Sequence, residues 1–222
     1  MKKNIYIVGD SFCHWRSDEN SHWPLILANM LGLNLKGNGY AGLSWWKTRK
    51  DFINFKETKD FENTEYFMFV HTDFSRILSD IDFFHELPEK EFEKEFEKIR
   101  EIWIKYMYNE EIEFWMMCNW FREINDLLKE KKVIHISGFD NPIKNFHLLN
   151  GLKFKDSLKE HSLNELKNSS NEKLIKKGLI DDFRHNHFSI ENNLKLALTI
   201  HNNIQKFYNT NFLNNEYTQI EL

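Results

Sequence analysis

The positions of apolar residues along the chain predict strands that alternate with helices. Short runs rich in β-branched and aromatic residues predict strands at residues 5–8, 33–36, 66–70, 133–136 and 152–158. Apolar positions that recur every three or four residues predict helices at 23–31, 89–108 and 111–131, and a last helix that begins after Ser189. This alternation is typical of an α/β fold in which helices cover both faces of a mainly parallel sheet.

Length and composition favour one domain over residues 1–222. With 222 residues, of which 41% are hydrophobic and 15% are aromatic, the chain can bury one substantial core. Three prolines and eight glycines leave little room for a flexible hinge between domains. Residues 141–177 are rich in polar residues, and we interpret this segment as an insertion, as a lid over the site, or as a surface excursion without a task in the mechanism.

Charge and hydropathy bear on partners and location. The 30 basic and 34 acidic residues give a net charge of -4, which does not favour nucleic acid or an anionic membrane as a partner. No apolar run approaches the roughly 20 residues that span a bilayer, and residues 1–20 lack the apolar stretch that is typical of a signal peptide. Cys13 and Cys118 lack paired spacing, which excludes a disulfide framework and a cysteine zinc site. We therefore expect a soluble, cytoplasmic protein.

A serine stands directly after the first predicted strand, in the segment Gly9-Asp10-Ser11-Phe12. Glycine permits the backbone torsions that a sharp exit from a strand needs. Open α/β sheets bind ligands at the carboxyl edge of their strands, where this serine would lie. The position predicts a nucleophile, and an ordinary capped turn is the alternative.

An acid and a histidine precede the last predicted helix. Ser189 is a good N-cap for that helix, so His187 lies two residues before an anchored helix end. A serine hydroxyl becomes a good nucleophile when an imidazole takes its proton, and a carboxylate then orients the imidazole. We predict that His187 is the general base and that Asp182 orients it. His185 and Asp181 are the alternatives for these two roles.

These segments resemble the sequence blocks of the SGNH (GDSL-type) hydrolase family. The first block of that family carries the nucleophile in Gly-Asp-Ser and the last carries Asp and His before the final helix, as in the order Ser11, Asp182, His187. Residues 38–44 are similar to the second block, so the resemblance implies that the amide of Gly42 contributes to an oxyanion hole. The resemblance further implies a flavodoxin-like, three-layer α/β/α sandwich and catalysis without a metal or an organic cofactor.

The segment after the predicted strand at 66–70 departs from the family pattern. The family usually offers an asparagine there as an oxyanion donor, and residues 71–76 contain none. The Thr72 hydroxyl, a backbone amide or Arg76 can supply the missing donor, or the donor is absent; an ionised Asp73 accepts hydrogen bonds and donates none, so we expect it only to contact the substrate. Loss of one such donor lowers rates about a hundredfold to a thousandfold, so the departure also fits a weak enzyme.

The resemblance implies a serine hydrolase that cleaves an ester through an acyl-enzyme. Trp15, Trp45 and Trp46 lie near the predicted site in sequence, and indole faces suit sugar rings. The expected partner is therefore a small-molecule or carbohydrate ester that carries an acetyl or longer acyl group. Core packing is the plainer role for these tryptophans.

Three other interpretations stay open. The chain can be a weak or inactive binding protein that keeps this fold. It can be a metal-dependent hydrolase in which His185 and His187 bind zinc or manganese together with Asp181 or Asp182. The thiol of Cys13, two residues after the serine, is a further candidate nucleophile.

Overall fold

A seven-stranded parallel sheet forms the centre of the molecule. The computed structural model describes residues 2–15, 21–40, 44–76, 89–139, 144–161, 188, 190–210 and 219–220. The strands are β1 (Asn4–Asp10), β2 (Asn34–Lys36), β3 (Gly39–Tyr40), β4 (Thr64–His71), β5 (Lys132–Ser137), β6 (Leu152–Ser157) and β7 (Gln219–Ile220). They follow the order β2-β1-β4-β5-β6-β7, β3 pairs with the end of β1, and every pairing is parallel.

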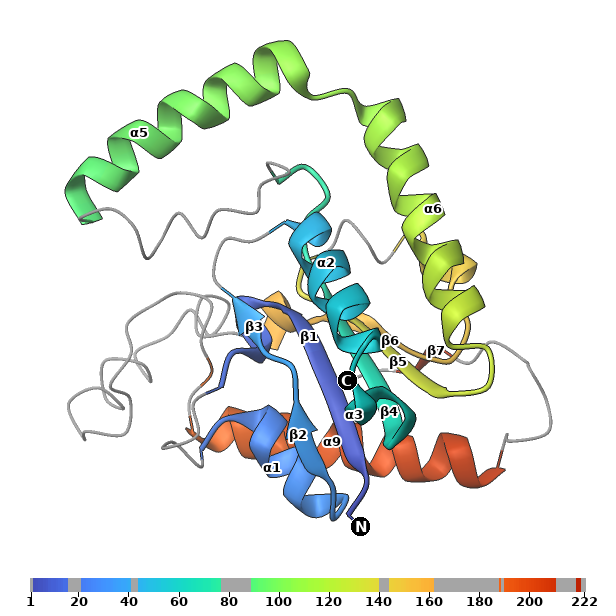
Figure 1. Ribbon diagram of the computed structural model, residues 1–222. Coiled ribbons are helices and arrows are strands. Elements are labelled where there is room, and N and C mark those ends of the chain that lie inside the picture. The colour runs from blue at the N-terminus through green and yellow to red at the C-terminus, as the bar shows by residue number, and fades with distance from the viewer. Residues whose placement is uncertain are drawn as a thin grey trace.

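Helices lie on both faces of this sheet (Figure 1). They are α1 (Trp23–Met30), α2 (Trp45–Lys56), α3 (Lys59–Glu62), α5 (Glu89–Ile102), α6 (Glu110–Leu127) and α9 (Ile190–Thr210). Short 3-10 turns span Ser11–Cys13, Phe146–Leu148 and Leu158–His161, and a π turn spans Trp103–Met107. Figure 1 shows α1 and α9 together on one face, α2 and α6 on the other, and α5 away from the sheet.

Strand β1 separates two hydrophobic cores. Its alternate residues Ile5 and Ile7 pack with α1 and α9, whereas Tyr6 and Val8 pack with α2 and α6. All four side chains are at most 2% exposed, because a parallel strand with helices on both faces has no side open to solvent. The predicted α/β fold, with a parallel sheet between two helical layers, is confirmed.

Most predicted elements are confirmed, and one expectation needs correction. The predicted helix at 89–108 is α-helical only to Ile102 and continues as the π turn. Within the polar segment 141–177, the predicted strand at 152–158 is present as β6, and Phe146 and Phe154 are fully buried in the core. The interpretation of the segment as an insertion or a lid stays a prediction. Residues 162–177 lie outside the described part of the chain. Helix α2, at Trp45–Lys56, was not predicted.

The strand order creates a switch point at the carboxyl end of β1. From β1 the chain crosses through α1 to β2 on one side, and it later crosses through α2 and α3 to β4 on the other side. In sheets of this order, ligands bind in the crevice where the connections diverge. The residues that follow β1 and β4 are therefore the first place to look for a functional site.

Candidate functional site

Ser11 occupies the first position after β1, and its hydroxyl is held by the preceding residue. The Oγ of Ser11 donates a hydrogen bond to Oδ1 of Asp10 at 2.9 Å, and the amide of Phe12 donates to the same oxygen at 3.4 Å. Asp10 is thus the N-cap of the turn Ser11–Cys13. The side chain of Ser11 is buried, with 7% of its surface exposed.

Gly9 makes this sharp exit from the strand possible. Its φ is +144°, and an added Cβ would lie 2.0 Å from the carbonyl oxygen of Val70 in β4. No residue other than glycine fits between the two strands there. The torsional role expected of Gly9 is present, together with a close approach of two backbones that sequence reasoning did not foresee.

The Asp10 carboxylate is a buried charge at the centre of the site. Its side chain is fully buried. Oδ2 accepts a hydrogen bond from Thr72 Oγ1 at 2.9 Å and forms an ion pair with Arg76 Nη1 at 2.8 Å. A buried carboxylate is stable when hydrogen bonds and a cation compensate it, which is the arrangement found here. Asp10 therefore links the end of β1 to the segment after β4.

Two of the three polar residues predicted after β4, Thr72 and Arg76, contact the Asp10 carboxylate, which also accepts the hydroxyl of Ser11. The Thr72 hydroxyl proton is used on Asp10, and the Arg76 guanidinium also stacks 4.9 Å from the ring of Phe139. The Oδ1 of Asp73 accepts a hydrogen bond from the nearby amide of Ser75 at 2.9 Å. Their predicted roles as oxyanion donors or substrate contacts stay predictions.

The second predicted block reaches the same edge through β3. Gly39 pairs with Gly9, and an added Cβ on Gly39 would lie 2.2 Å from the carbonyl oxygen of Asp10. The Oδ1 of Asn38 accepts the amides of Gly39 at 2.8 Å and of Trp15 at 3.0 Å. This segment packs directly against the Ser11 turn, and Asn38 is a positioning residue that sequence reasoning missed. Gly42 lies outside the described residues.

The predicted acid and base lie outside the described residues as well. This holds for Asp181, Asp182, His185 and His187. The structure does describe the residue that follows His187. The ring of Phe188 lies 5.9 Å from the ring of Phe12, and Phe12 directly follows Ser11. Sequence neighbours of the predicted base and of the predicted nucleophile are therefore in contact.

An asparagine of α9 fixes this junction. Asn193 Nδ2 donates to the carbonyl of Phe188 at 3.2 Å, and Asn193 Oδ1 accepts the amide of Trp23 at 2.9 Å. The indole of Trp23 in turn donates to the carbonyl of Phe12 at 2.7 Å. A chain of buried hydrogen bonds therefore runs from α9 through α1 to the Ser11 turn. Sequence reasoning missed Asn193 and Trp23, because nothing in their spacing indicates a contact 170 residues apart.

Cys13 does not have the surroundings of a nucleophile. Its side chain is fully buried, and its Sγ donates to the carbonyl of Asp10 at 3.1 Å. Burial, with the nearby Asp10 charge, raises the pKa of the Cys13 thiol well above its usual range. Since the thiolate is the reactive form, this environment disfavours the thiol alternative.

Two buried histidines lie behind the site, one in β4 and one in β5. His135 Nε2 donates to the carbonyl of Asn150 at 3.1 Å, so its Nδ1 accepts from Nε2 of His71 at 3.0 Å. Burial lowers the pKa of His71 to about 3, and it lowers the pKa of His135 well below its usual range. Both imidazoles are therefore neutral at pH 7, and they support the strand that leads to Thr72.

Two further observations concern metals and membranes. Within the described ranges, no three His, Cys, Asp or Glu side chains are placed to share a metal ion. The residues of the metal-dependent alternative, at 181–187, lie outside those ranges. None of the helices in the part of the chain that the structure describes is both long and apolar enough to cross a bilayer.

Comparisons with known proteins find similar solved structures but no similar sequence. No family model and no curated protein matches the sequence. The chain is similar to a solved structure from Desulfitobacterium hafniense DCB-2, described as that of a candidate lipolytic protein of the G-D-S-L family. The sequence identity is 13% and the TM-score is 0.43, and the match covers 91% of this chain and 99% of the other. An assignment of function therefore depends on the residues described above.

Proposed function

We propose that this protein is a serine hydrolase that cleaves an ester, with Ser11 as the nucleophile, His187 as the general base and Asp182 as the residue that orients it. The observation that carries the proposal is the position of Ser11 at the switch point of the sheet, one residue from the contact between Phe12 and Phe188. That contact supports a base at His187, since consecutive Cα atoms are about 3.8 Å apart.

The reaction would follow the usual course of acyl transfer. Ser11 Oγ attacks the ester carbonyl carbon while its proton passes to the His187 imidazole, and the amides of Ser11 and Gly42 donate to the oxyanion. The intermediate then expels the alcohol, which takes the proton back from the imidazolium. Water repeats the attack on the acyl-enzyme, releases the acid and regenerates Ser11.

Attack requires the Ser11 hydroxyl to leave Asp10. Its proton is directed at a carboxylate oxygen 2.9 Å away, so transfer to an imidazole requires the hydroxyl to rotate about its Cβ–Oγ bond, away from Asp10. We expect Arg76 and Thr72 to keep Asp10 in place during this turn, because both remain bonded to its other oxygen. Asp10 is a positioning residue in this scheme.

The same hydrogen bond favours a second candidate function. A serine that is 7% exposed and bonded to a buried carboxylate also suits a binding protein without turnover. The two candidates differ in the reactivity of Ser11 toward a fluorophosphonate, which labels only an activated serine.

The test is fluorophosphonate labelling followed by mass spectrometry, with p-nitrophenyl acetate turnover measured in parallel. We expect the label on Ser11 and loss of both signals in Ser11→Ala. Ser75→Ala is the matched control, because Ser75 is an exposed serine at the same edge of the sheet. Absence of label together with turnover equal in wild type and Ser11→Ala rejects the hydrolase. Loss of activity in His185→Ala but not in His187→Ala assigns the base to His185.

A further inference from the structure

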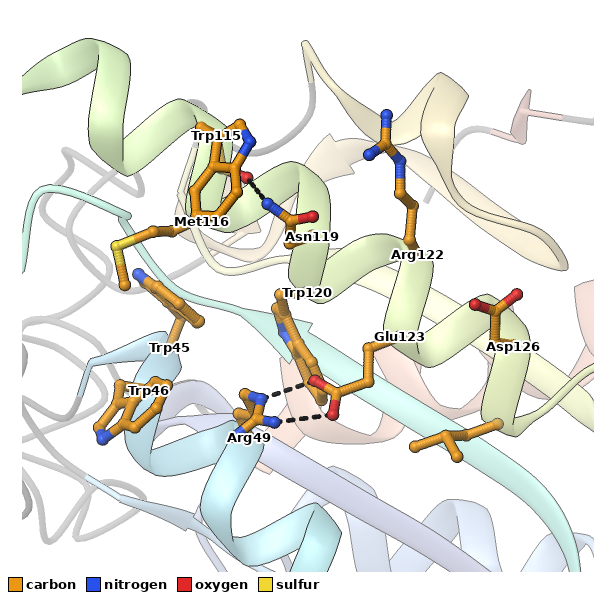
Figure 2. A pocket seen from close by; sticks show the side chains of 11 residues that line it. Trp45, Trp46, Arg49, Trp115, Met116, Asn119, Trp120, Arg122, Glu123 and Asp126 are labelled. Atoms are coloured by element: carbon orange, nitrogen blue, oxygen red, sulfur yellow. Dashed lines mark hydrogen bonds and ion pairs between the residues drawn. The ribbon is translucent and has the colours of Figure 1, made fainter.

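A groove of about 710 Å³ lies between α2 and α6, on the face of the sheet opposite α9. Figure 2 shows its lining, in which tryptophans gather at one end and charged side chains lie toward the other. The volume is typical of a site for a small molecule. None of the residues that line the groove belongs to the catalytic set proposed above.

Three indoles form the apolar end of the groove. Trp45 and Trp46 come from the first turn of α2, and their rings meet edge to face at 5.9 Å and 90°. Trp115 comes from α6 and is 65% exposed. Figure 2 shows it above the other two indoles, with Met116 between them. An indole that stays in solvent at a groove keeps its flat apolar face for a ligand.

The wall beside the indoles is polar. Arg49 donates to both carboxylate oxygens of Glu123, at 2.6 and 2.7 Å, and its guanidinium carbon lies 5.2 Å from the ring of Trp46. Asn119 Nδ2 donates to the carbonyl of Trp115 at 2.8 Å, which directs the amide oxygen of Asn119 away from the helix backbone. These groups present donors and acceptors next to a flat apolar surface.

The charges of the groove cancel. The charged lining residues are Arg49, Arg122, Glu123 and Asp126. Two cations and two anions favour neither an anionic ligand, such as a phosphate, nor a cationic one. A neutral ligand with an apolar face and a rim of hydroxyl groups fits best, because each hydroxyl can both donate and accept a hydrogen bond.

From this lining we infer that the α2–α6 groove binds a neutral carbohydrate, whose sugar rings stack on the indoles of Trp46 and Trp115 and whose hydroxyl groups contact the Arg49–Glu123 pair. The apolar end adjoins the candidate site, since the ring of Trp45 lies 5.7 Å from that of Phe74 in the segment after β4. If the proposed function holds, the sugar is part of the ester substrate. This last clause rests on that proposal, whereas binding itself does not.

The experiment titrates the wild-type protein with cellobiose, chitobiose and xylobiose, and with adenosine as a planar aromatic probe. Tryptophan fluorescence and saturation-transfer NMR report binding. We expect at least one disaccharide to bind with a millimolar or lower Kd, and Trp115→Ala to weaken that binding about tenfold. Phe114→Ala is the matched control, because Phe114 is 51% exposed on the same helix and does not line the groove.

Three results overturn the inference. They are binding of no disaccharide at millimolar concentration, binding of adenosine alone, and equal weakening by Trp115→Ala and Phe114→Ala. Ser11→Ala tests sugar binding independently of hydrolysis, since this variant should bind the disaccharide as tightly as wild type. Sugar binding with neither fluorophosphonate labelling nor turnover that depends on Ser11 supports the groove and rejects the hydrolase, and labelling of Ser11 without sugar binding does the reverse.

A kinetic comparison tests the link between the two sites. With an acetylated form of the disaccharide that binds, Trp115→Ala should raise KM about tenfold with little change in kcat. Phe114→Ala should leave KM for this ester as in wild type, because Phe114 does not line the groove. An equal rise in KM in both variants contradicts a role for the groove in substrate binding.

Discussion

The neutral histidine pair in β4 and β5 predicts a specific loss of stability in acid. Because burial lowers the pKa of His71 to about 3, the folded protein does not protonate this imidazole between pH 7 and pH 5. The unfolded chain does, since an ordinary histidine has a pKa near 6.5. The contribution of His71 to stability is therefore complete above pH 6.5 and is lost as the pH falls toward 3.

The size of this loss follows from proton linkage. Each pH unit below 6.5 costs about 1.36 kcal/mol for one histidine that stays neutral when folded, so His71 alone accounts for about 2 kcal/mol between pH 7 and pH 5. His135 shifts in the same direction, which makes about 4 kcal/mol an upper bound for the pair. Glu113 opposes this change, because burial raises the pKa of its carboxyl group.

Comparison of wild type with His71→Phe isolates the contribution of His71 to this pH-dependent loss of stability. The variant leaves Nδ1 of His135 without its donor and should lose about 1 to 3 kcal/mol at every pH, but its further loss between pH 7 and pH 5 should be about 2 kcal/mol smaller than that of wild type. Urea unfolding at both pH values, followed by tryptophan fluorescence, measures both quantities. His147→Gln changes an exposed histidine and serves as the control. An equal pH-dependent loss in wild type and His71→Phe refutes the reasoning.

Three more variants test the structure by urea unfolding. Gly9→Ala should lower the free energy of unfolding by about 3 kcal/mol or more, because its Cβ would lie 2.0 Å from the backbone of β4. Gly32→Ala has open space around its Cβ and should lower it by only about 1 kcal/mol, from its φ of +70°; equal losses contradict the packing argument. Thr72→Val should cost about 2 kcal/mol through its lost hydrogen bond to the buried Asp10 carboxylate, and an unchanged unfolding midpoint contradicts this. Lys153→Met removes a buried ammonium group whose pKa burial lowers to about 8, together with its hydrogen bond to the Leu149 carbonyl, so its free energy of unfolding relative to wild type should be higher at pH 7 than at pH 10; a difference that is the same at both pH values is the contrary result.

The strands could be predicted because burial on both faces leaves a strong signal in the sequence. Residues 5–8 of β1 are an unbroken apolar run, and the position of this run directly before Gly9 placed Ser11 at the carboxyl edge. Helix α2 escaped prediction because only Trp45, Thr48 and Phe52 of its residues are buried, and charged residues separate them. The buried stripe is too narrow to dominate the periodicity of that segment.

The partners of Ser11 could not be predicted from the sequence in the same way. Asp10 was expected as part of a short motif, yet its partners Thr72 and Arg76 reach it only because β4 pairs with β1. Long-range pairings of this kind have no periodicity, and the residue types involved are common at the ends of strands. The histidine pair escaped for the same reason, since His71 and His135 meet across β4 and β5 from positions 64 residues apart.

Packing remote from the chemistry determines how the two ends of the chain approach one another. Phe12 and Phe188 touch because α9 packs on α1, and Asn193 ties that helix to the amide of Trp23. If His187 is the base, its distance from Ser11 depends on the register of α9, and a slip of one helical turn would move it by about 5.4 Å, well beyond hydrogen-bond reach. The precision of the proposed site thus derives from a buried amide and two phenyl rings, none of which takes part in proton transfer.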